Sequence, residues 1–168
     1  TKGGLAKVYG AVSGEWASKI SGSEVDYFLP ALEVRKYTAL PGKMVLAGRI
    51  RYETIQDIED TETIPINKRL FLGGTNTVRG YSYQKLGPLD AAGKPVGGQS
   101  ALNGNVELRY PIFKKISGVL FVDMGYVDLD PLTLNGDDLR FTSGVGLRYH
   151  TPIGPLRIAF GYKLNRPT

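Results

Sequence analysis

The sequence predicts an all-β protein: a fragment of about seven strands from an antiparallel transmembrane β-barrel. Three observations support this fold class. Apolar and polar residues alternate with period two in segments of about 9–11 residues, the length at which a tilted strand crosses a membrane. Short turns and long loops alternate along the 168 residues. Helical periodicity is scarce, and there is no apolar run of roughly 18 residues from which a transmembrane helix could form.

The first three predicted strands cover residues 6–16, 27–38 and 44–54. In the first, one face carries Val8, Val12 and Trp16 and the other carries Lys7, Ser13 and Glu15. In the second, Phe28, Leu32 and Val34 lie opposite Glu33 and Arg35, although Pro30 and Lys36 interrupt the pattern. The third is regular, with Met44, Leu46, Ile50 and Tyr52 opposite Arg49, Arg51 and Glu53.

The remaining four predicted strands cover residues 101–112, 118–126, 141–150 and 156–164. Their apolar positions carry aliphatic and aromatic residues, namely Val106, Leu108, Val122, Val145, Ile158, Phe160 and Tyr162. Their polar positions include Asn105, Glu107, Asp123, Arg148 and Arg157. In a barrel, the apolar set faces lipid and the polar set faces the lumen.

The connections between these strands alternate in length. Pro41–Lys43, residues 113–118 and residues 151–155 are short, whereas 17–26, 55–100 and 127–140 are long. Outer-membrane barrels have this arrangement, with short turns on the periplasmic side. Five tyrosines fall near strand ends on the apolar face, as in an interfacial aromatic girdle: Tyr52, Tyr110, Tyr126, Tyr149 and Tyr162.

A soluble β-sandwich is the main alternative, because its strands also alternate. Its polar face would lie outside, which gives aromatic side chains little reason to gather at strand ends. Its strands also average about 5–6 residues. Both features favour the membrane barrel.

Composition excludes several classes of function. The net charge is +5, but the basic residues are scattered through the sequence, so we expect no nucleic-acid partner. Cysteine is absent, which excludes disulfides and cysteine-based metal sites. We expect no metal site and no cofactor.

The long segment between the third and fourth strands contains a loop, residues 57–99, that we expect to be ordered. It is rich in glycine, but it also carries the apolar and aromatic residues Phe71, Leu72, Val78, Tyr81, Tyr83 and Leu86. A loop of this length with such residues is usually functional. Its central motif is Val78-Arg79-Gly80-Tyr81. The pairs Gly73-Gly74 and Gly97-Gly98 lack the strand–helix context of a phosphate cradle, so they indicate close backbone approach.

Glu107 and Asp123 lie on the polar faces of two successive strands. Paired carboxylates can act as general acid and base. We favour a structural role, in which they bind the guanidinium of Arg79 inside the barrel. No set of nucleophile, base and orienting group is visible, and the single histidine, His150, sits at a strand end. We therefore expect no catalytic residues.

Several motifs together resemble the BamA/TamA superfamily of outer-membrane assembly and translocation barrels, the bacterial surface antigen family. The signature loop corresponds to Phe71-x-Gly73-Gly74-x₃-Val78-Arg79-Gly80-Tyr81, continued by Gly87-Pro88-x₄-Gly93-x-Pro95-x-Gly97-Gly98. Two strand motifs are also similar, Glu107-Leu108-Arg109-Tyr110-Pro111-Ile112 and Phe121-Val122-Asp123-Met124-Gly125. A later hairpin, from Gly144 to Arg157, is like the penultimate hairpin of the family.

The resemblance implies that residues 1–168 are the C-terminal part of a sixteen-stranded barrel and correspond to strands 9–15. The first half, the final strand and any POTRA or enzymatic domains would lie outside this chain. The resemblance also implies that Arg79 enters the lumen and pairs with Glu107 and Asp123. The sequences of residues 93–95 and 151–155 are more similar to the TamA-like branch of the family.

The function implied is insertion, assembly or translocation of outer-membrane proteins, without enzymatic activity. The implied location is the bacterial outer membrane. The implied partners are its lipids, unfolded β-barrel or autotransporter clients, and a periplasmic partner. The alternatives are a passive pore and a barrel anchor of a two-partner secretion or patatin-fused system. A lumen-bound loop favours the first reading because it plugs the pore.

Overall fold

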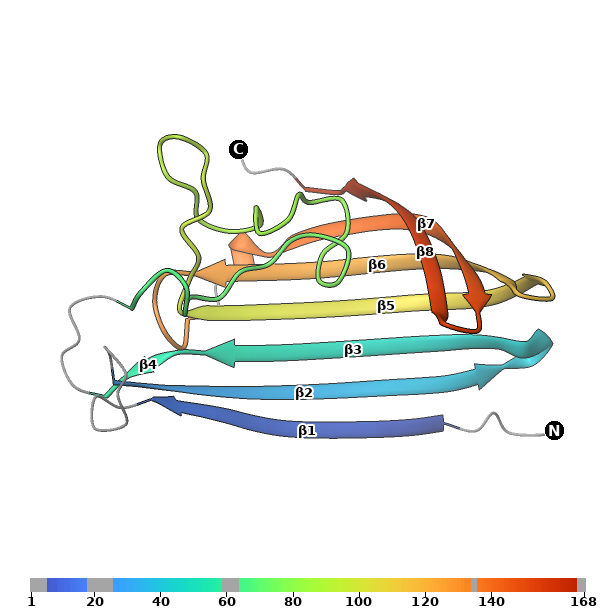
Figure 1. Cartoon of the computed structure of the whole chain (residues 1–168), viewed down its shortest axis with the longest axis horizontal. Coiled ribbons are helices and arrows are strands. Elements are labelled where there is room, and N and C mark those ends of the chain that lie inside the picture. Colours follow the sequence, from blue (N-terminus) through green and yellow to red (C-terminus); the bar gives the residue numbers. More distant parts are fainter. Residues whose placement is uncertain (1–5, 18–25, 59–63, 134–135, 166–168) are drawn as a thin grey trace.

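The computed structural model describes residues 6–17, 26–58, 64–133 and 136–165. They form one antiparallel sheet in the order β1-β2-β3-β5-β6-β7-β8, and a short strand, β4, also pairs with β2 (Figure 1). The strands are β1 Ala6–Ala17, β2 Tyr27–Leu40, β3 Met44–Thr54, β4 Gln56–Asp57, β5 Ser100–Phe113, β6 Ile116–Asp128, β7 Arg140–Thr151 and β8 Gly154–Lys163. The described residues also include two single 3₁₀ turns, η2 Pro41–Lys43 and η3 Gly136–Asp138. The predicted fold class and all seven predicted strands are confirmed.

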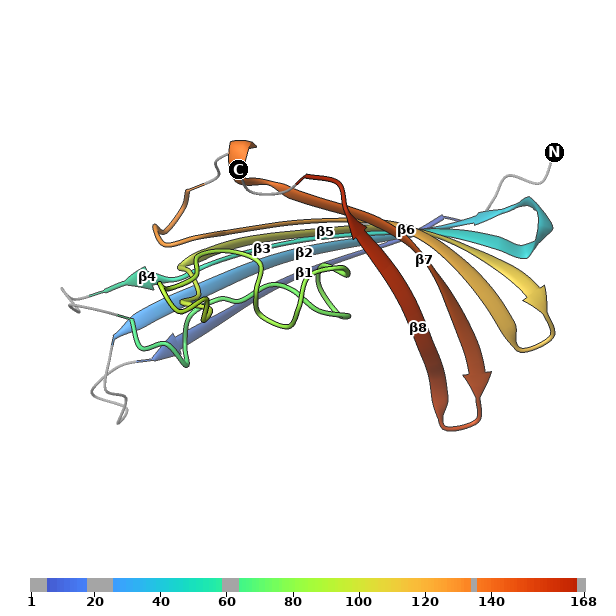
Figure 2. The same cartoon turned by 90° about the horizontal axis from the view of Figure 1, so that it is seen from above.

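The sheet is an up-and-down meander that curves toward one side. Its short turns, which join β2 to β3, β5 to β6 and β7 to β8, lie at one end, and the long connections lie at the other. Strands β7 and β8 bend toward the side on which the loop between β4 and β5 lies (Figure 2). The loop therefore occupies the concave face. Strands β1 and β8 are the two edges of the described sheet.

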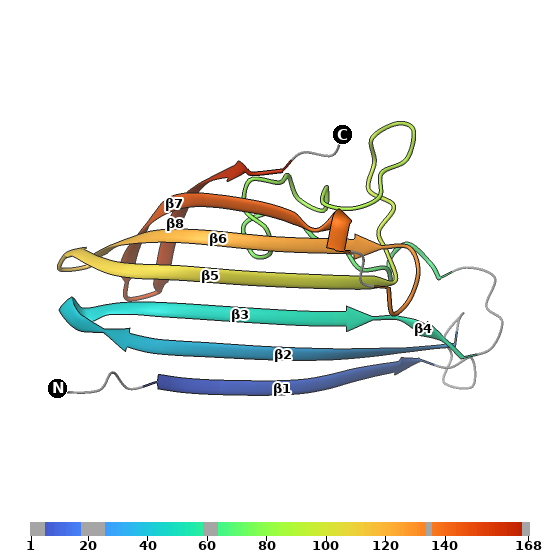
Figure 3. The ribbon, with the colours of Figure 1, turned by 180° about the vertical axis from the view of Figure 1, so that it is seen from behind.

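The two faces of the sheet differ as the alternation predicts. The convex face carries exposed apolar side chains, among them Val106, Val145 and Phe160. Along most of their length, β1 to β6 have no other part of the described chain over them on that side (Figure 3). Phe160, for example, is 74% exposed. In register, Val106 lies between Gly48 and Val122, and Val145 lies between Leu120 and Phe160. The polar positions Arg49, Glu107, Arg148 and Arg157 instead line a pocket on the concave face.

Strand β2 tolerates Pro30 because the pairing on one side of β2 is interrupted there. Its ladder with β3 ends at the Ala31–Glu53 pair, and its ladder with β4 resumes at the Phe28–Gln56 pair. Proline cannot donate a ladder hydrogen bond, so it fits at such a break. The two-residue strand β4 is missing from the sequence prediction, since it is too short to show any alternation.

The loop between β4 and β5 is ordered where the structure describes it, residues 64–99, as expected. Three isolated bridges fold it, Leu70–Gly98, Leu72–Leu86 and Leu89–Pro95. Its apolar side chains pack in a buried cluster with the strands: Leu72, Val78, Tyr81, Leu86, Ala101 and Val127. Tyr83 is an exception to the expectation, because it is 76% exposed and contributes nothing to this cluster.

Tyr126 departs from the predicted aromatic girdle, since only 1% of it is exposed. The chain after β6 folds over this end of the convex face: Ser100 Oγ donates to the carbonyls of Asp130 and Thr133, and Leu132 N donates to Thr54 Oγ1. Tyr126 is buried at the same end, and its hydroxyl donates to Asp128. In contrast, Tyr149 and Tyr162 are exposed. No helix among the described residues is long and apolar enough to cross a membrane.

Candidate functional site

The motif around Arg79 is carried on a tight turn of the loop. Gly74 N donates to the carbonyl of Tyr81, and Gly73 N donates to Thr77 Oγ1. Gly73 and Gly80 adopt φ of +114° and +94°, a region that favours glycine. A Cβ on Gly73 would lie 2.5 Å from the carbonyl oxygen of Ser82. The turn is therefore specific to glycine, and it aims Arg79 at the sheet.

Arg79 binds two carboxylates on neighbouring strands. Its Nε and Nη2 donate to the two oxygens of Asp123, each over 2.7 Å, and its backbone N donates to Asp123 Oδ2 over 3.0 Å. Its Nη1 donates to Glu107 Oε1 over 2.7 Å. The expected pairing of Arg79 with Glu107 and Asp123 is thus present, and it includes the fork-shaped contact that only an arginine makes.

Asp123 is fully buried beneath the loop. Besides Arg79, it accepts a hydrogen bond from Asn105 Nδ2 over 2.9 Å. The same amide group donates to the Thr77 carbonyl over 2.7 Å, and Asn103 Nδ2 donates to that carbonyl over 3.2 Å. The strands therefore bind the backbone of the turn as well as the Arg79 side chain.

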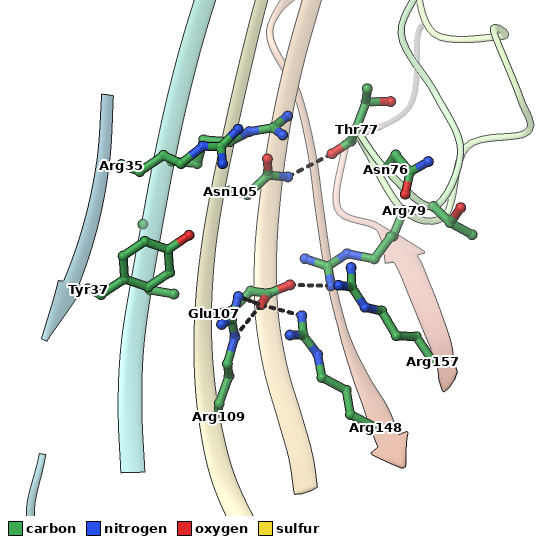
Figure 4. A pocket seen from close by; sticks show the side chains of 14 residues that line it. Arg35, Tyr37, Asn76, Thr77, Arg79, Asn105, Glu107, Arg109, Arg148 and Arg157 are labelled. Atoms are coloured by element: carbon green, nitrogen blue, oxygen red, sulfur yellow. Dashed lines mark hydrogen bonds and ion pairs between the residues drawn. The ribbon is translucent and has the colours of Figure 1, made fainter. Parts of the chain in front are cut away.

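Glu107 is shared by three arginines (Figure 4). Its Oε2 accepts from Arg109 Nε over 2.9 Å and from Arg148 Nη2 over 2.7 Å, while its Oε1 binds Arg79. Only the Arg79 contact was predicted from the sequence. Arg109 lies two residues after Glu107 on the same face of β5, so its contact is local. Arg148 comes from β7, and its approach depends on the register of β5, β6 and β7.

An aromatic ring and two glycines complete the seat of Arg79. The guanidinium lies 3.5 Å from the centroid of the Phe121 ring, a cation–π contact. The backbone of the turn lies against Gly161 of β8, where a Cβ would come within 2.8 Å of the Arg79 carbonyl oxygen. A Cβ on Gly144 of β7 would come within 2.5 Å of the Phe121 ring. Glycine inside a strand often marks such a close approach, and this signal was available in the sequence.

Positive charge is in excess around the Arg79 site. Burial by itself would lower the pKa of Arg79, but its hydrogen bonds to Asp123 and the charges of Asp123 and Glu107 raise it above the ordinary arginine value. The basic residues that are scattered in sequence gather here, in a pocket lined by Arg35, Arg49, Arg79, Arg109, Arg148 and Arg157. They gather because alternate positions of neighbouring strands share one face.

The arrangement holds a loop in place and offers little reactive chemistry. Both carboxylates are engaged by arginines. His150 lies at the end of β7, where its Nε2 is 3.4 Å from Ser117 Oγ. Among the described residues, no group of three His, Cys, Asp or Glu side chains could hold a metal ion. The site is best described as an ion-paired anchor for the turn that carries Arg79.

Comparison with known sequences shows the family of this chain. A model described as the Omp85 superfamily domain matches residues 7–168. The chain is 31% identical over 170 residues to outer membrane protein assembly factor BamA of Nitratidesulfovibrio vulgaris, covering 98% of this chain and 21% of that protein. It is 31% identical over 99 residues to the chloroplastic outer envelope protein 80 of Arabidopsis thaliana, covering 54% of this chain and 12% of that protein. The chain thus spans about a fifth of the first relative.

A solved structure has the same fold. The crystal structure of BamA from Haemophilus ducreyi lacking POTRA domains 1–3 superposes with a TM-score of 0.78. The match covers 96% of this chain and 36% of that chain, at 20% sequence identity. At this identity the likeness concerns the fold, and it agrees with the predicted barrel fragment. The preference for a TamA-like branch stays a prediction.

Proposed function

Because the chain belongs to the Omp85 superfamily, we propose that it is the C-terminal part of an outer-membrane barrel that inserts or assembles other β-barrel proteins. The relative from N. vulgaris, which aligns over almost the whole chain, is named an outer membrane protein assembly factor. The apolar convex face and the polar concave face of the sheet suit a wall between lipid and a lumen. We place the protein in the bacterial outer membrane on these grounds.

The observation that carries this proposal is the loop anchored on the concave face. A passive pore requires an open lumen, whose charges then set ion selectivity. Here residues 64–99 lie on the concave face, and Arg79 fixes their turn to β5 and β6 through Glu107 and Asp123. A loop held in this way narrows the lumen, which supports an assembly role over free diffusion of solutes.

The proposed mechanism uses strand edges. In lipid, each unsatisfied backbone group costs several kcal/mol, so a barrel with a weakly closed seam has a reactive edge. Such an edge can pair with a strand of an unfolded client by β-augmentation. The anchored loop would keep β5 and β6 rigid while the seam opens. The clients, the surrounding lipids and a periplasmic partner are the binding partners in this proposal.

The proposed function is not enzymatic. The acidic groups that could act in proton transfer, Glu107 and Asp123, are each bound by arginine. Their oxygens accept hydrogen bonds from Arg79, Arg109 and Arg148, which leaves them poorly placed to exchange a proton with a substrate. An anchor role requires this ion-paired state.

Reconstitution of the full-length protein tests the proposal. Proteoliposomes containing it would be mixed with an unfolded β-barrel client, and client folding would be followed by resistance to protease. We expect folded client to accumulate faster than in protein-free liposomes. Solute flux through the liposomes without any gain in client folding would instead identify a passive pore, and export of a soluble partner would identify a two-partner secretion translocator.

A further inference from the structure

Lys36 is a cationic residue on the convex, mostly apolar face of its strand. It occupies an outward position of β2, where it pairs in register with Val8 of β1 and Gly48 of β3. Its side chain is exposed. Among the residues that the structure describes, no carboxylate lies within ion-pair distance of it. A lysine on the lipid face of a barrel strand is strongly unfavourable at the membrane midplane and close to neutral near the interface. An unpaired charge there calls for a partner in the membrane.

An apolar groove of about 340 Å³ lies beside Lys36 on the convex face. Its walls include Val34, Ile50, Val106 and Met124. Its hollow is at Gly48, where an added Cβ would meet no other atom within 4 Å. Lys36 lines the same groove and lies directly across the strand pair from Gly48. This part of the convex face therefore combines a positive charge with a groove that can hold an apolar chain.

Lys36 lies in the half of β2 that leads to a short turn. It lies four residues before Leu40, where β2 ends at the short turn Pro41–Lys43. Short turns mark the periplasmic end of an outer-membrane barrel. From there, a lysine can extend its aliphatic stem along apolar surface and bring its ammonium to the interface.

We propose that Lys36 and the groove at Gly48 bind one anionic glycerophospholipid of the periplasmic leaflet, such as phosphatidylglycerol. The phosphate pairs with the Lys36 ammonium, and an acyl chain lies over Gly48 between Ile50 and Val106. This inference rests on the membrane placement proposed above. It goes beyond that proposal because it assigns a defined lipid site to two residues that take no part in the Arg79 anchor.

Lipid crosslinking tests the site in the full-length protein. The protein would be placed in vesicles of phosphatidylethanolamine that contain a minor fraction of phosphatidylglycerol with a photoreactive acyl chain. We expect crosslinks on peptides that contain Gly48 or Val106. Lys36→Met should reduce them roughly five-fold, since one basic residue near an anionic surface contributes about 1 kcal/mol. Lys115→Gln, a substitution of an exposed lysine in the β5–β6 turn, should leave them unchanged.

Filling the groove provides an independent variant. Gly48→Leu has room for its side chain and should abolish the crosslinks, whereas Gly10→Leu, at an equally open site outside the groove, should retain them. Heat-dependent mobility on gels confirms that each variant is a folded barrel. Equal labelling of all variants, equal loss in both leucine variants, or stronger labelling by a lipid A probe than by phosphatidylglycerol would overturn the proposal. Because client assembly is not the readout, failure here is distinguishable from failure of the proposed function.

Discussion

Arg79 and Asp123 form a two-pronged ion pair that joins the loop to β6: Nε and Nη2 of the arginine each lie 2.7 Å from a different oxygen of the carboxylate. The backbone N of Arg79 adds a third bond to the same side chain. The carboxylate is fully buried, so water offers it little alternative solvation. This pair, more than the single contact of Arg79 with Glu107, fixes the turn on the sheet.

Neutral substitutions of the two acidic partners should therefore have different effects. Asp123→Asn removes the charge that accepts three hydrogen bonds from Arg79, so we expect the loop to be released. The free energy of unfolding of the barrel should fall by about 3–5 kcal/mol, or by less where lumen water screens the loss. Glu107→Gln leaves the Asp123 contacts in place but frees the positive charge of Arg109 and Arg148. Limited proteolysis of residues 64–99 should detect release only in Asp123→Asn. Reversal potentials in planar bilayers should shift toward anions in Glu107→Gln. Equal protease sensitivity of both variants would contradict the ranking.

Close packing of the turn against β8 predicts a specific effect at Gly80. Gly80 and Gly93 both have positive φ, +94° and +73°, so alanine strains the backbone at either site. Only at Gly80 would the added Cβ also lie 2.9 Å from a backbone oxygen, that of Gly161. We expect Gly80→Ala to lower the midpoint of urea unfolding clearly more than Gly93→Ala does. Matching midpoints would show that the turn does not press on β8.

The assignment of faces predicts which positions meet lipid. Residues 1–168 contain no cysteine, so single-cysteine variants in an otherwise cysteine-free protein report these positions one at a time. A lipid-soluble maleimide should label cysteines introduced at positions 50, 106 and 160. Cysteines introduced at positions 49 and 157 should instead react with a charged reagent that enters only from water. A one-residue error in register would exchange the two sets, since every side chain in a strand then changes face.

Much of this structure follows from the sequence because its signals are local. Alternation within a strand determines which side chains share a face, so the convex positions of β3, β5, β7 and β8 are predictable one strand at a time. The pairing of Arg79 was predictable for a different reason, since a cation entering a polar lumen requires carboxylates and two were available on successive strands.

The features that the sequence analysis missed depend on long-range register or on short segments. Arg148 meets Glu107 only because β5 and β7 are aligned on either side of β6. Tyr126 is buried because the chain after β6 folds back over the convex face, which alternation cannot report. The contact of the turn with Gly161 joins residues about eighty positions apart. Its only local sign was glycine at polar-face positions.

Substitution of Arg79 in the full-length protein tests most directly whether the anchored loop serves assembly. Arg79→Ala leaves Glu107 and Asp123 without their shared cation, and Arg79→Lys restores a charge without the planar fork that binds both oxygens of Asp123. The two variants would be compared with the wild type in a client-folding assay and, in parallel, by planar-bilayer conductance.

We predict that Arg79→Ala slows client folding and raises conductance as the loop loosens, and that Arg79→Lys recovers both properties only in part. Unchanged client folding together with unchanged conductance in Arg79→Ala would contradict the proposed role of the loop.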